Sequence, residues 1–401
     1  MTKTNNYAMS KTKKVFLKNE ANMSIVAILA LLLAVGNSII NSFQGIYAFT
    51  DSLNHFVFPF FFFYVSLEAR RQIISETGHL RGKKAIQPLL MAIGGVAVPM
   101  GIFAYIFPEG FTPEGGMFIP IATDIAFVVL AMKGTKISDK LKSILLAIAI
   151  ADDIIGIGFL ATSFESWDLG KIIFITLIGI LVIVCMMSQK KIDSFKITRE
   201  RTFWLLVCSL FIYVFHILHI HTTVAGVICA LMVPYHPGAK RMKESEKAKR
   251  KVKVDDSIYH VLEEDVLSVL CGWFVIPAFI ILNVNIPVQD LQMTDLLRRE
   301  SIAIISGLFI GKTIGIFSIG ILTAYFFGFP GKNKKELLGG SMLCGIGFTV
   351  SLFFATLSTG IEKVISTVAI LTGSLISGIS GLFMIRYANN QPFFPKIKKA
   401  N

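Results

Sequence analysis

The chain has 401 residues, of which 54% are hydrophobic and only 16% are charged. This composition is typical of a polytopic membrane protein and excludes an ordinary soluble domain. The net charge of +13 would suit a nucleic-acid-binding protein, but the basic residues gather in short segments between apolar runs. No nucleic-acid partner is therefore expected.

Runs of about 20 apolar residues, each long enough for one crossing of a lipid bilayer, recur along the chain. The twelve predicted spans are, in chain order, 22–43, 53–69, 85–107, 116–132, 143–163, 171–189, 202–220, 222–235, 264–284, 300–327, 337–358 and 362–388. The predicted fold class is an all-α integral membrane protein. Its domain organisation is a cytoplasmic N-terminal tail at 1–21, a twelve-helix domain at 22–388 with a cytoplasmic loop at about 236–263, and a cytoplasmic C-terminal tail at 389–401.

The distribution of Lys and Arg predicts how the spans are oriented. If the Lys-rich N-terminus is cytoplasmic and the spans alternate in direction, the inner segments carry 34 of the 39 Lys and Arg residues. This is the positive-inside pattern, with both termini in the cytoplasm and an even number of spans. Lys312 is the one basic residue that lies deep within a span, away from its ends.

The fourth predicted span, 116–132, carries three residues that disfavour a continuous helix. Pro120 removes a backbone donor, and Thr123 and Asp124 can bond to nearby backbone groups instead of continuing the helix. Interrupted backbone at membrane depth is tolerated only where it is buried in protein or lines a cavity. We therefore predict a broken helix here, with an ordinary proline kink as the alternative.

Two adjacent acids, Asp152 and Asp153, lie inside the apolar span at 143–163. A single charge at the bilayer centre costs roughly 2.5–3.5 kcal/mol on insertion scales, so an incidental pair is not expected. Acids at this depth must be neutralised by protons, by a basic partner or by a bound cation. This is the chemistry of a cation/proton carrier, in which protons and a hard Na⁺ or Li⁺ ion compete for the two carboxylates. Transport is electrogenic if both acids cycle.

The buried Lys312 must either pair with an acid or lose its proton, and Asp152 or Asp153 is the expected partner. In the eleventh span, Gly345 and Gly347 permit backbone conformations that other residues cannot adopt, which predicts a second helix break. Close helix packing is the alternative explanation for these glycines.

The two interrupted spans are the middle members of the triplets formed by spans 3–5 and 10–12, which run in opposite orientations. Paired interruptions of this kind are typical of transporters with inverted-topology repeats, whose broken helices cross near the bilayer midplane. At such a crossing, we expect Asp124 to offset the positive helix ends and Lys312 to offset the negative ones.

Three polar clusters near the ends of spans are less specific. Glu68 closes the second span together with Arg70 and Arg71. These charges could form an interfacial salt bridge or line a cytoplasmic ion funnel. His216, His219 and His221 lack a convincing zinc spacing and suit exposed histidines or pH sensing. Glu263, Glu264 and Asp265 open the ninth span, where solvated acids are the default.

Several motifs together carry a resemblance to a known family. They are Ala122-Thr-Asp-Ile-Ala-Phe127 followed by Asp152-Asp153, Gly311-Lys312, Cys344-Gly-Ile-Gly-Phe-Thr349, His221 to Val227, and Leu67 to Arg71. With these motifs in the expected spans, the chain resembles the NhaA family of sodium/proton antiporters, as a divergent member. The resemblance implies a bacterial inner-membrane protein that exchanges intracellular Na⁺ or Li⁺ for external H⁺ and contributes to pH homeostasis.

The resemblance also implies roles for individual residues. Asp153 would be the principal Na⁺ or Li⁺ ligand, and Asp152 the second essential acid, paired with Lys312 in the ion-free state. Thr123 and Asp124 would line the crossing of the broken helices. Three residues would serve the cytoplasmic entrance and the pH response, namely Glu68, Arg71 and Glu264, and His221 would shape the pH profile.

The chain departs from the family pattern at several positions outside this core. His55 replaces a usual aspartate, Ser66 a usual glycine, and Asp265 and Ser268 two usual histidines. Only about a dozen residues join the first two spans, too few for the family's β-hairpin, which is associated with dimer contacts. A homodimer is therefore left open, and the expected partners are the lipid bilayer and small cations.

Three alternative functions remain. An ion-coupled symporter for an organic anion would need more polar lining than Thr123, Thr349 and Ser351 provide. A transport-inactive homologue would fit the altered entrance. An enzyme is disfavoured because Asp152 and Asp153 are not followed by a third acid for magnesium, and no second aspartate lies in a Gly-x-Gly-Asp sequence. No cofactor is predicted beyond the transported ions.

Overall fold

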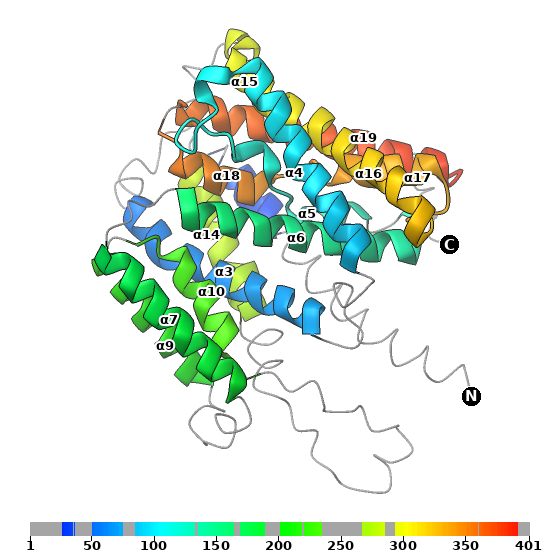
Figure 1. The fold of residues 1–401 in the computed structure, drawn as a ribbon. Coiled ribbons are helices and arrows are strands. Elements are labelled where there is room, and N and C mark those ends of the chain that lie inside the picture. Colours follow the sequence, from blue (N-terminus) through cyan, green and yellow to red (C-terminus); the bar gives the residue numbers. More distant parts are fainter. Residues whose placement is uncertain are drawn as a thin grey trace, which may run out of the picture. The chain divides into compact units, whose positions relative to one another are not determined.

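The structure is a computed structural model. It describes residues 26–34, 36, 50–74, 85–132, 135–163, 169–188, 201–218, 220–234, 267–284, 293–359 and 361–391. Every regular element within these ranges is a helix, which agrees with the predicted all-α class (Figure 1). The predicted tail at 1–21, the loop at about 236–263 and most of the tail at 389–401 lie outside the described residues, as does Glu264.

The chain divides into two compact units. The first comprises Met1–Gln44, Gly82–Gly158 and Ile280–Asn401, and the second comprises Gly45–Arg81 and Phe159–Phe279. The helices assigned wholly or mainly to the first unit are α4 (Ile86–Ile106), η2 (Pro108–Gly110), η3 (Ile119–Ile121), α5 (Ile125–Met132), α6 (Asp139–Ser163), η7 (Met293–Leu297), α15 (Arg299–Ser306), η8 (Gly307–Gly311), α16 (Lys312–Phe327), α17 (Lys334–Leu343), α18 (Phe348–Leu357) and α19 (Lys363–Ala388). Residues 26–34 are also helical.

The second unit is built from fewer helices. They are α3 (Thr50–Ile74), α7 (Leu169–Met187), α9 (Arg201–Ile217), α10 (Thr223–Met232), α13 (Ser268–Leu270) and η6 (Cys271–Val275), followed by α14 (Ile276–Asn283), which begins in this unit.

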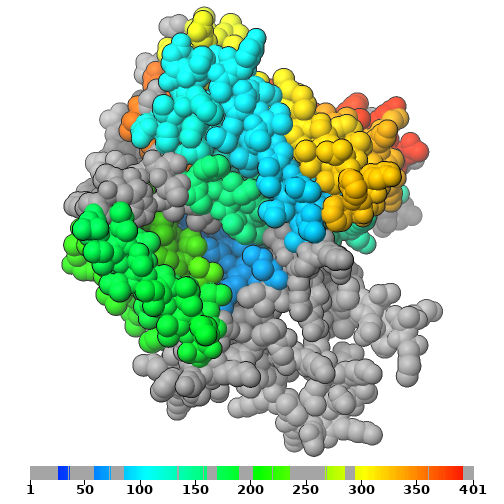
Figure 2. Space-filling view, viewed as in Figure 1, coloured from blue at the N-terminus to red at the C-terminus, as the bar shows by residue number. Residues whose placement is uncertain are grey.

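In the first unit, α4 and α16 lie side by side because glycines allow their backbones to approach closely (Figure 1). A Cβ on Gly94 would come within 2.7 Å of the Gly315 carbonyl oxygen. The opposite face of α4 carries exposed aliphatic side chains at helical spacing, Ile86, Leu89, Leu90 and Ile93. Figure 2 shows this helix, in cyan, at the surface of the molecule. An apolar exposed stripe of this kind suits contact with lipid.

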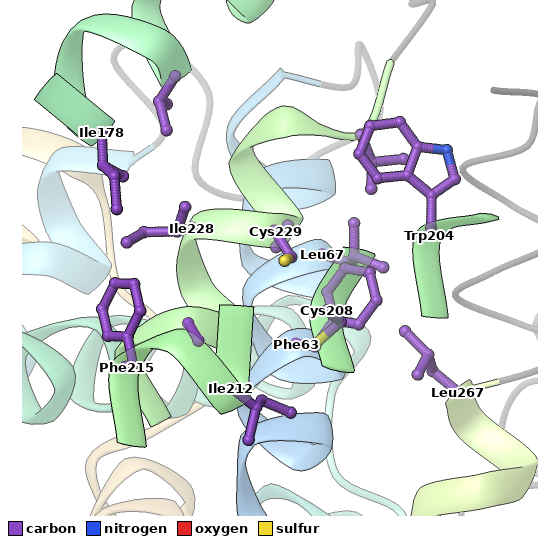
Figure 3. Close-up of a cluster of buried hydrophobic side chains, with 14 of the residues drawn as sticks. Phe63, Leu67, Ile178, Trp204, Cys208, Ile212, Phe215, Ile228, Cys229 and Leu267 are labelled. Carbon is purple, nitrogen blue, oxygen red and sulfur yellow. The ribbon is translucent and has the colours of Figure 1, made fainter. Parts of the chain in front are cut away.

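The second unit has an apolar core made by four helices (Figure 3). On α9 the buried side chains recur every three to four residues, at Trp204, Cys208, Ile212 and Phe215. They pack with residues such as Phe63 of α3, and with α7 and α10. The other face of α9 is exposed and apolar, with Leu206, Leu210, Tyr213 and Ile217. Helix α9 is thus apolar on both faces, which is expected of a helix in a bilayer.

Four helices of the described residues are long and apolar enough to cross a membrane: α4, α7, the continuous helix Arg299–Phe327 and α19. The pair α17 and α18 makes a fifth candidate if the two are counted as one bent span. These helices begin and end within three residues of the predicted spans. By contrast, α6 begins at Asp139, four residues before the predicted start, and α3 continues five residues beyond its predicted end.

The helix Arg299–Phe327 contains a π-helical turn, η8, just before Lys312. The glycines at both ends of this turn face prolines of other segments. A Cβ on Gly307 would lie 2.6 Å from Pro120 Cβ, and one on Gly311 would lie 2.7 Å from Pro99 Cα. The small residues therefore let the turn pack directly against these prolines. Single π-turns within α-helices occur frequently at functional sites.

Candidate functional site

The first segment of the candidate site separates η3 from α5. Pro120 lies buried in η3, and the chain then becomes extended at Ala122, with φ −74° and ψ 150°. Thr123 and Asp124 follow without helical structure, and α5 begins at Ile125. The structure thus places a non-helical stretch where the sequence predicts an interruption.

The second segment, Cys344–Gly347, separates α17 from α18, and the two helix axes differ in direction by 42°. Neither of its glycines has a positive φ; that of Gly347 is −94°. The prediction that these glycines are needed for backbone conformations that other residues cannot adopt is therefore wrong. The reason is space, because a Cβ on Gly345 would overlap the Leu308 carbonyl oxygen and one on Gly347 would lie 3.1 Å from the Ala122 carbonyl oxygen.

The two segments bond directly to each other through buried groups. The Asp124 backbone N–H donates to the Ile346 carbonyl oxygen at 2.6 Å. The Ser351 hydroxyl donates to the Ile119 carbonyl oxygen at 2.8 Å. These contacts satisfy backbone groups that a helix break leaves without an intrahelical partner, which is a strict requirement away from water.

The Asp124 carboxylate accepts hydrogen bonds from the N-terminal turns of two helices. Its Oδ1 accepts from the Phe127 N–H of α5 at 3.2 Å. Its Oδ2 accepts from the Thr349 N–H of α18 at 3.0 Å and from the Thr349 hydroxyl at 2.6 Å. A carboxylate is favourable at a helix N-terminus, where unpaired N–H groups and the helix dipole carry positive partial charge. The arrangement suits the helix-end role predicted for Asp124.

Asp152, Lys312 and Thr123 form a buried cluster next to these segments. Lys312 Nζ pairs with Asp152 Oδ2 and donates to Thr123 Oγ1 at 2.7 Å. Thr123 Oγ1 lies 2.7 Å from Asp152 Oδ2 and 2.9 Å from the Cys344 carbonyl oxygen, so its single proton can serve one of these acceptors at a time. Lys312 thus contacts Asp152 directly and reaches the C-terminal end of α17 through Thr123, so its helix-end role stays a prediction.

Asp153 is buried beside this cluster, but its carboxylate is less well satisfied. Its Oδ1 has no hydrogen-bond partner among the described residues, and neither has Asp152 Oδ1. Successive residues of α6 point about 100° apart, which lets Asp152 face Lys312 while Asp153 faces elsewhere. With Asp124, three buried carboxylates accompany a single buried ammonium group in this part of the structure.

Glu68 and Arg71, two of the residues predicted at the entrance, lie in the second unit. Arg71 pairs with Glu68, which agrees with the salt bridge considered from the sequence. Arg70 Nη1 donates to the Ala230 carbonyl oxygen at 2.8 Å and to the Val233 carbonyl oxygen at 2.6 Å, at the C-terminal end of α10.

His221, also in the second unit, precedes α10. Its Nδ1 lies 2.8 Å from Thr223 Oγ1, within hydrogen-bond distance. Of the other predicted polar residues, His219 and Glu264 lie outside the described residues. The pH-related roles of these side chains stay predictions.

Sequence reasoning missed two kinds of group near the segments. One is backbone carbonyls, such as that of Cys344, which no sequence pattern reveals. The other is a pair of hydroxyls from α19: Ser374 Oγ accepts from the Gly347 N–H at 3.3 Å, and Ser377 Oγ is buried without a partner among the described residues. The recurrence of Ser and Gly at helical spacing in α19 was the available signal.

The chemistry of the cluster favours a small hard cation over a transition metal. The described residues contain no group of three or more His, Cys, Asp or Glu side chains arranged to hold a metal ion. Carboxylate, hydroxyl and carbonyl oxygens do converge around Asp152 and Thr123. Oxygen donors of this kind suit hard cations and protons.

Comparison with known proteins agrees on one family. Residues 16–385 match the family model described as Na⁺/H⁺ antiporter 1. The chain is 31% identical over 382 residues to a Na⁺/H⁺ antiporter NhaA of Porphyromonas gingivalis, covering 84% of this chain and 82% of that protein. It is 30% identical over 410 residues to a Na⁺/H⁺ antiporter NhaA of Pelagibacter ubique, covering 96% and 99% of the two chains.

Proposed function

The chain belongs to the Na⁺/H⁺ antiporter family, as its motifs indicated, and we propose that it exchanges intracellular Na⁺ or Li⁺ for external H⁺ at Asp152 and Asp153. Na⁺/H⁺ exchange is the activity of this family, whose members are multi-pass inner-membrane transporters and not enzymes. They need no cofactor. The proposal therefore concerns the site and its mechanism.

The observation that carries the proposal is the charge imbalance at the site. Asp124, Asp152 and Asp153 are all buried, and Lys312 is the only buried basic side chain described in their unit. Lys312 and the helix ends can offset two of the carboxylates. The remaining negative charge must be offset by a proton or by a cation, because an uncompensated buried charge is expensive. A site with this requirement exchanges one for the other.

Each residue has a distinct part in the proposed mechanism. Asp153, whose Oδ1 lacks a hydrogen-bond partner in the described structure, is the principal ligand of the transported ion. Asp152 is the second acid, and it leaves Lys312 when the ion binds. Thr123 supplies an oxygen that already lies 2.7 Å from Asp152 Oδ2. Protons and the cation compete for the two carboxylates, so two protons exchange for one Na⁺ and transport is electrogenic.

The finer architecture forms part of the same proposal. We infer that the chain crosses the membrane twelve times, in inverted repeats, and that both termini are cytoplasmic. The cytoplasmic tails are residues 1–21 and 389–401, and the cytoplasmic loop lies at about 236–263. The helix breaks at Pro120 and at Gly345 and Gly347 cross near the bilayer midplane, and alternating movement of one bundle exposes the site to each side.

The residues beyond the central cluster act in access and regulation. Glu68, Arg71 and Glu264 belong to the cytoplasmic entrance and pH response, and His221 to the pH profile. The ion pair between Glu68 and Arg71 supports a shared role for these two side chains. Whether the protein works as a homodimer stays open.

The test is the collapse of a pH gradient in everted membrane vesicles on addition of NaCl, LiCl or KCl, from mildly acidic to mildly alkaline pH. Wild type is expected to respond to Na⁺ or Li⁺, and Asp153→Asn is expected to abolish the response. Asp139→Asn is the matched control, because Asp139 is an exposed acid at the start of the same helix. The lumen of an everted vesicle corresponds to the outside of the cell, so an imposed lumen-positive potential should accelerate the exchange if two protons leave for each Na⁺ that enters.

Two results would contradict the proposal. The first is Na⁺-dependent exchange that survives in folded, inserted Asp153→Asn. The second is the absence of any response in wild type, which would favour the inactive homologue. A response driven by an organic anion, with none to Na⁺ alone, would instead favour the symporter.

A further inference from the structure

A second buried carboxylate of the first unit, Glu336, lies outside the proposed ion site. It is fully buried in the first turn of α17. Its Oε1 accepts from the Ser138 N–H at 2.7 Å, and its Oε2 accepts from the Ser138 hydroxyl at 3.0 Å and from the Lys332 N–H at 2.6 Å. No basic side chain pairs with it among the described residues. Three neutral donors at the starts of α6 and α17 therefore take the place of a basic partner for this carboxylate.

The carboxylate joins the starts of two helices. Ser138 is the N-cap of α6, since its carbonyl oxygen accepts from the Lys142 N–H at 3.0 Å. Its hydroxyl is directed to Glu336. On the other side, Asn333 caps α17 by accepting from the Glu336 N–H at 2.8 Å. Glu336 has the position of a capping-box glutamate but reaches beyond its own helix to the start of α6.

Neighbouring contacts hold the same region. Lys140 Nζ donates to the Phe329 carbonyl oxygen at 2.7 Å, which ties the first turn of α6 to the segment before α17. Farther along, a Cβ on Gly340 would lie 3.0 Å from a methyl group of Leu145, so α17 and α6 pack closely. The two helices are therefore in contact between the Ser138–Leu145 and Glu336–Gly340 segments.

We propose that Glu336 is a positioning residue for transport, which fixes the register of α6 against α17 and thereby holds the ion site together. The inference rests on the proposed function. About 21 Å of helix separates Ser138 from Asp152, and about 10 Å separates Glu336 from Leu343, at the helical rise of 1.5 Å per residue. Beyond these distances, the Thr123 hydroxyl lies between Asp152 Oδ2, in the middle of α6, and the Cys344 carbonyl oxygen, at the C-terminal end of α17.

The Thr123 hydroxyl is sensitive to this register because its distances to the two helices are short, 2.7 and 2.9 Å. A shift of α17 along α6 by even part of an ångström takes one of them out of hydrogen-bond range. Glu336→Gln provides such a perturbation. An amide at this position keeps one acceptor but brings an NH₂ group against the N–H of either Lys332 or Ser138, and each of these groups can only donate.

The test compares three purified full-length variants in proteoliposomes, with transport expressed per folded molecule. Glu336→Gln is expected to raise the apparent KM for Na⁺ about tenfold, the equivalent of one lost charge-assisted hydrogen bond. Ser138→Ala, which loses only the hydroxyl contact, is expected to raise it about two- to threefold. Lys334→Gln, an exposed change in the same turn of α17, is the control and should leave KM unchanged.

Amide hydrogen–deuterium exchange supplies a readout that does not depend on transport. The amides of residues 344–349 should exchange faster in Glu336→Gln than in Lys334→Gln, and Ser138→Ala should lie between them. A lower yield of folded protein with wild-type KM and wild-type exchange would overturn the inference, because Glu336 would then only stabilise the fold. Should Glu336→Gln not fold, Ser138→Ala alone decides. A wild type without Na⁺ transport would refute the proposed function, whereas the exchange result would still decide the role of Glu336.

Discussion

The two units of the molecule use buried charge differently. In the second unit, the buried charged side chains Glu68 and Arg70 lie near the end of α3, and Arg70 satisfies carbonyls where α10 ends. The first unit has buried acids at helix starts as well, but it also holds Asp152, Asp153 and Lys312 inside long apolar helices, far from either end. Charge at a helix end has a structural use in any membrane protein. Charge within a span is expensive and therefore marks chemistry.

The largest expected effect is on the buried pair in the first unit. Lys312→Ala removes the cation from Asp152 and leaves a buried carboxylate without its ion-pair partner. We expect the free energy of unfolding in detergent micelles to fall by about 3–5 kcal/mol, measured by denaturant titration. The double variant Asp152→Leu with Lys312→Leu is the control and should recover most of the loss, because no charge remains buried there. Equal stability of Lys312→Ala and wild type would mean that the pair is not buried as described.

An intermediate effect is expected in the second unit. Arg70→Met removes the donor to the Ala230 and Val233 carbonyl oxygens and should lower the free energy of unfolding by about 1.5–3 kcal/mol. The KM for Na⁺ should not change, because this charge serves structure. Arg298→Met, which removes a half-exposed surface ion pair, should change stability by less than about 1 kcal/mol. A clear shift in KM for Arg70→Met would break the distinction between the two units.

The smallest effect sharpens the description of the first unit. Thr349→Val removes the hydroxyl bond to Asp124 but keeps the backbone N–H bond, so a loss of about 1 kcal/mol is expected in the same titration. Thr356→Val, on the same helix, removes only a bond to its own Phe353 carbonyl oxygen and should be close to neutral. If Thr349→Val and Thr356→Val lower the free energy of unfolding equally, the hydrogen bond from the Thr349 hydroxyl to Asp124 contributes no more than an ordinary bond to the helix's own backbone.

Much of this site could be predicted from the sequence because charge in an apolar run is conspicuous. Asp152, Asp153 and Lys312 stand out by composition alone, and Pro120 with Thr123 and Asp124 indicated a non-helical stretch, which the structure has between η3 and α5. The family follows from the order of these motifs and is confirmed by the match over residues 16–385.

Other features could not be read in advance because they depend on how segments approach one another. Gly345 is required by the nearby Leu308 carbonyl oxygen, a contact between segments far apart in sequence. Glu336 follows two lysines in a polar stretch and looks like a solvated acid, yet it is fully buried by donors from another loop. Burial of a residue beside a span end depends on tertiary packing, which local composition does not encode.

The π-turn at Gly307–Gly311 determines the direction in which the later side chains of the same helix point. A π-turn accommodates one more residue than an α-turn, so the residues after Gly311 are rotated by about 100° relative to an uninterrupted helix. Drawn as a regular helical wheel from Arg299, Lys312 would project in the wrong direction. The inserted residue thus aims the lysine at Asp152, and a chain shortened by one residue within this turn would keep all the charges of the site and lose their alignment.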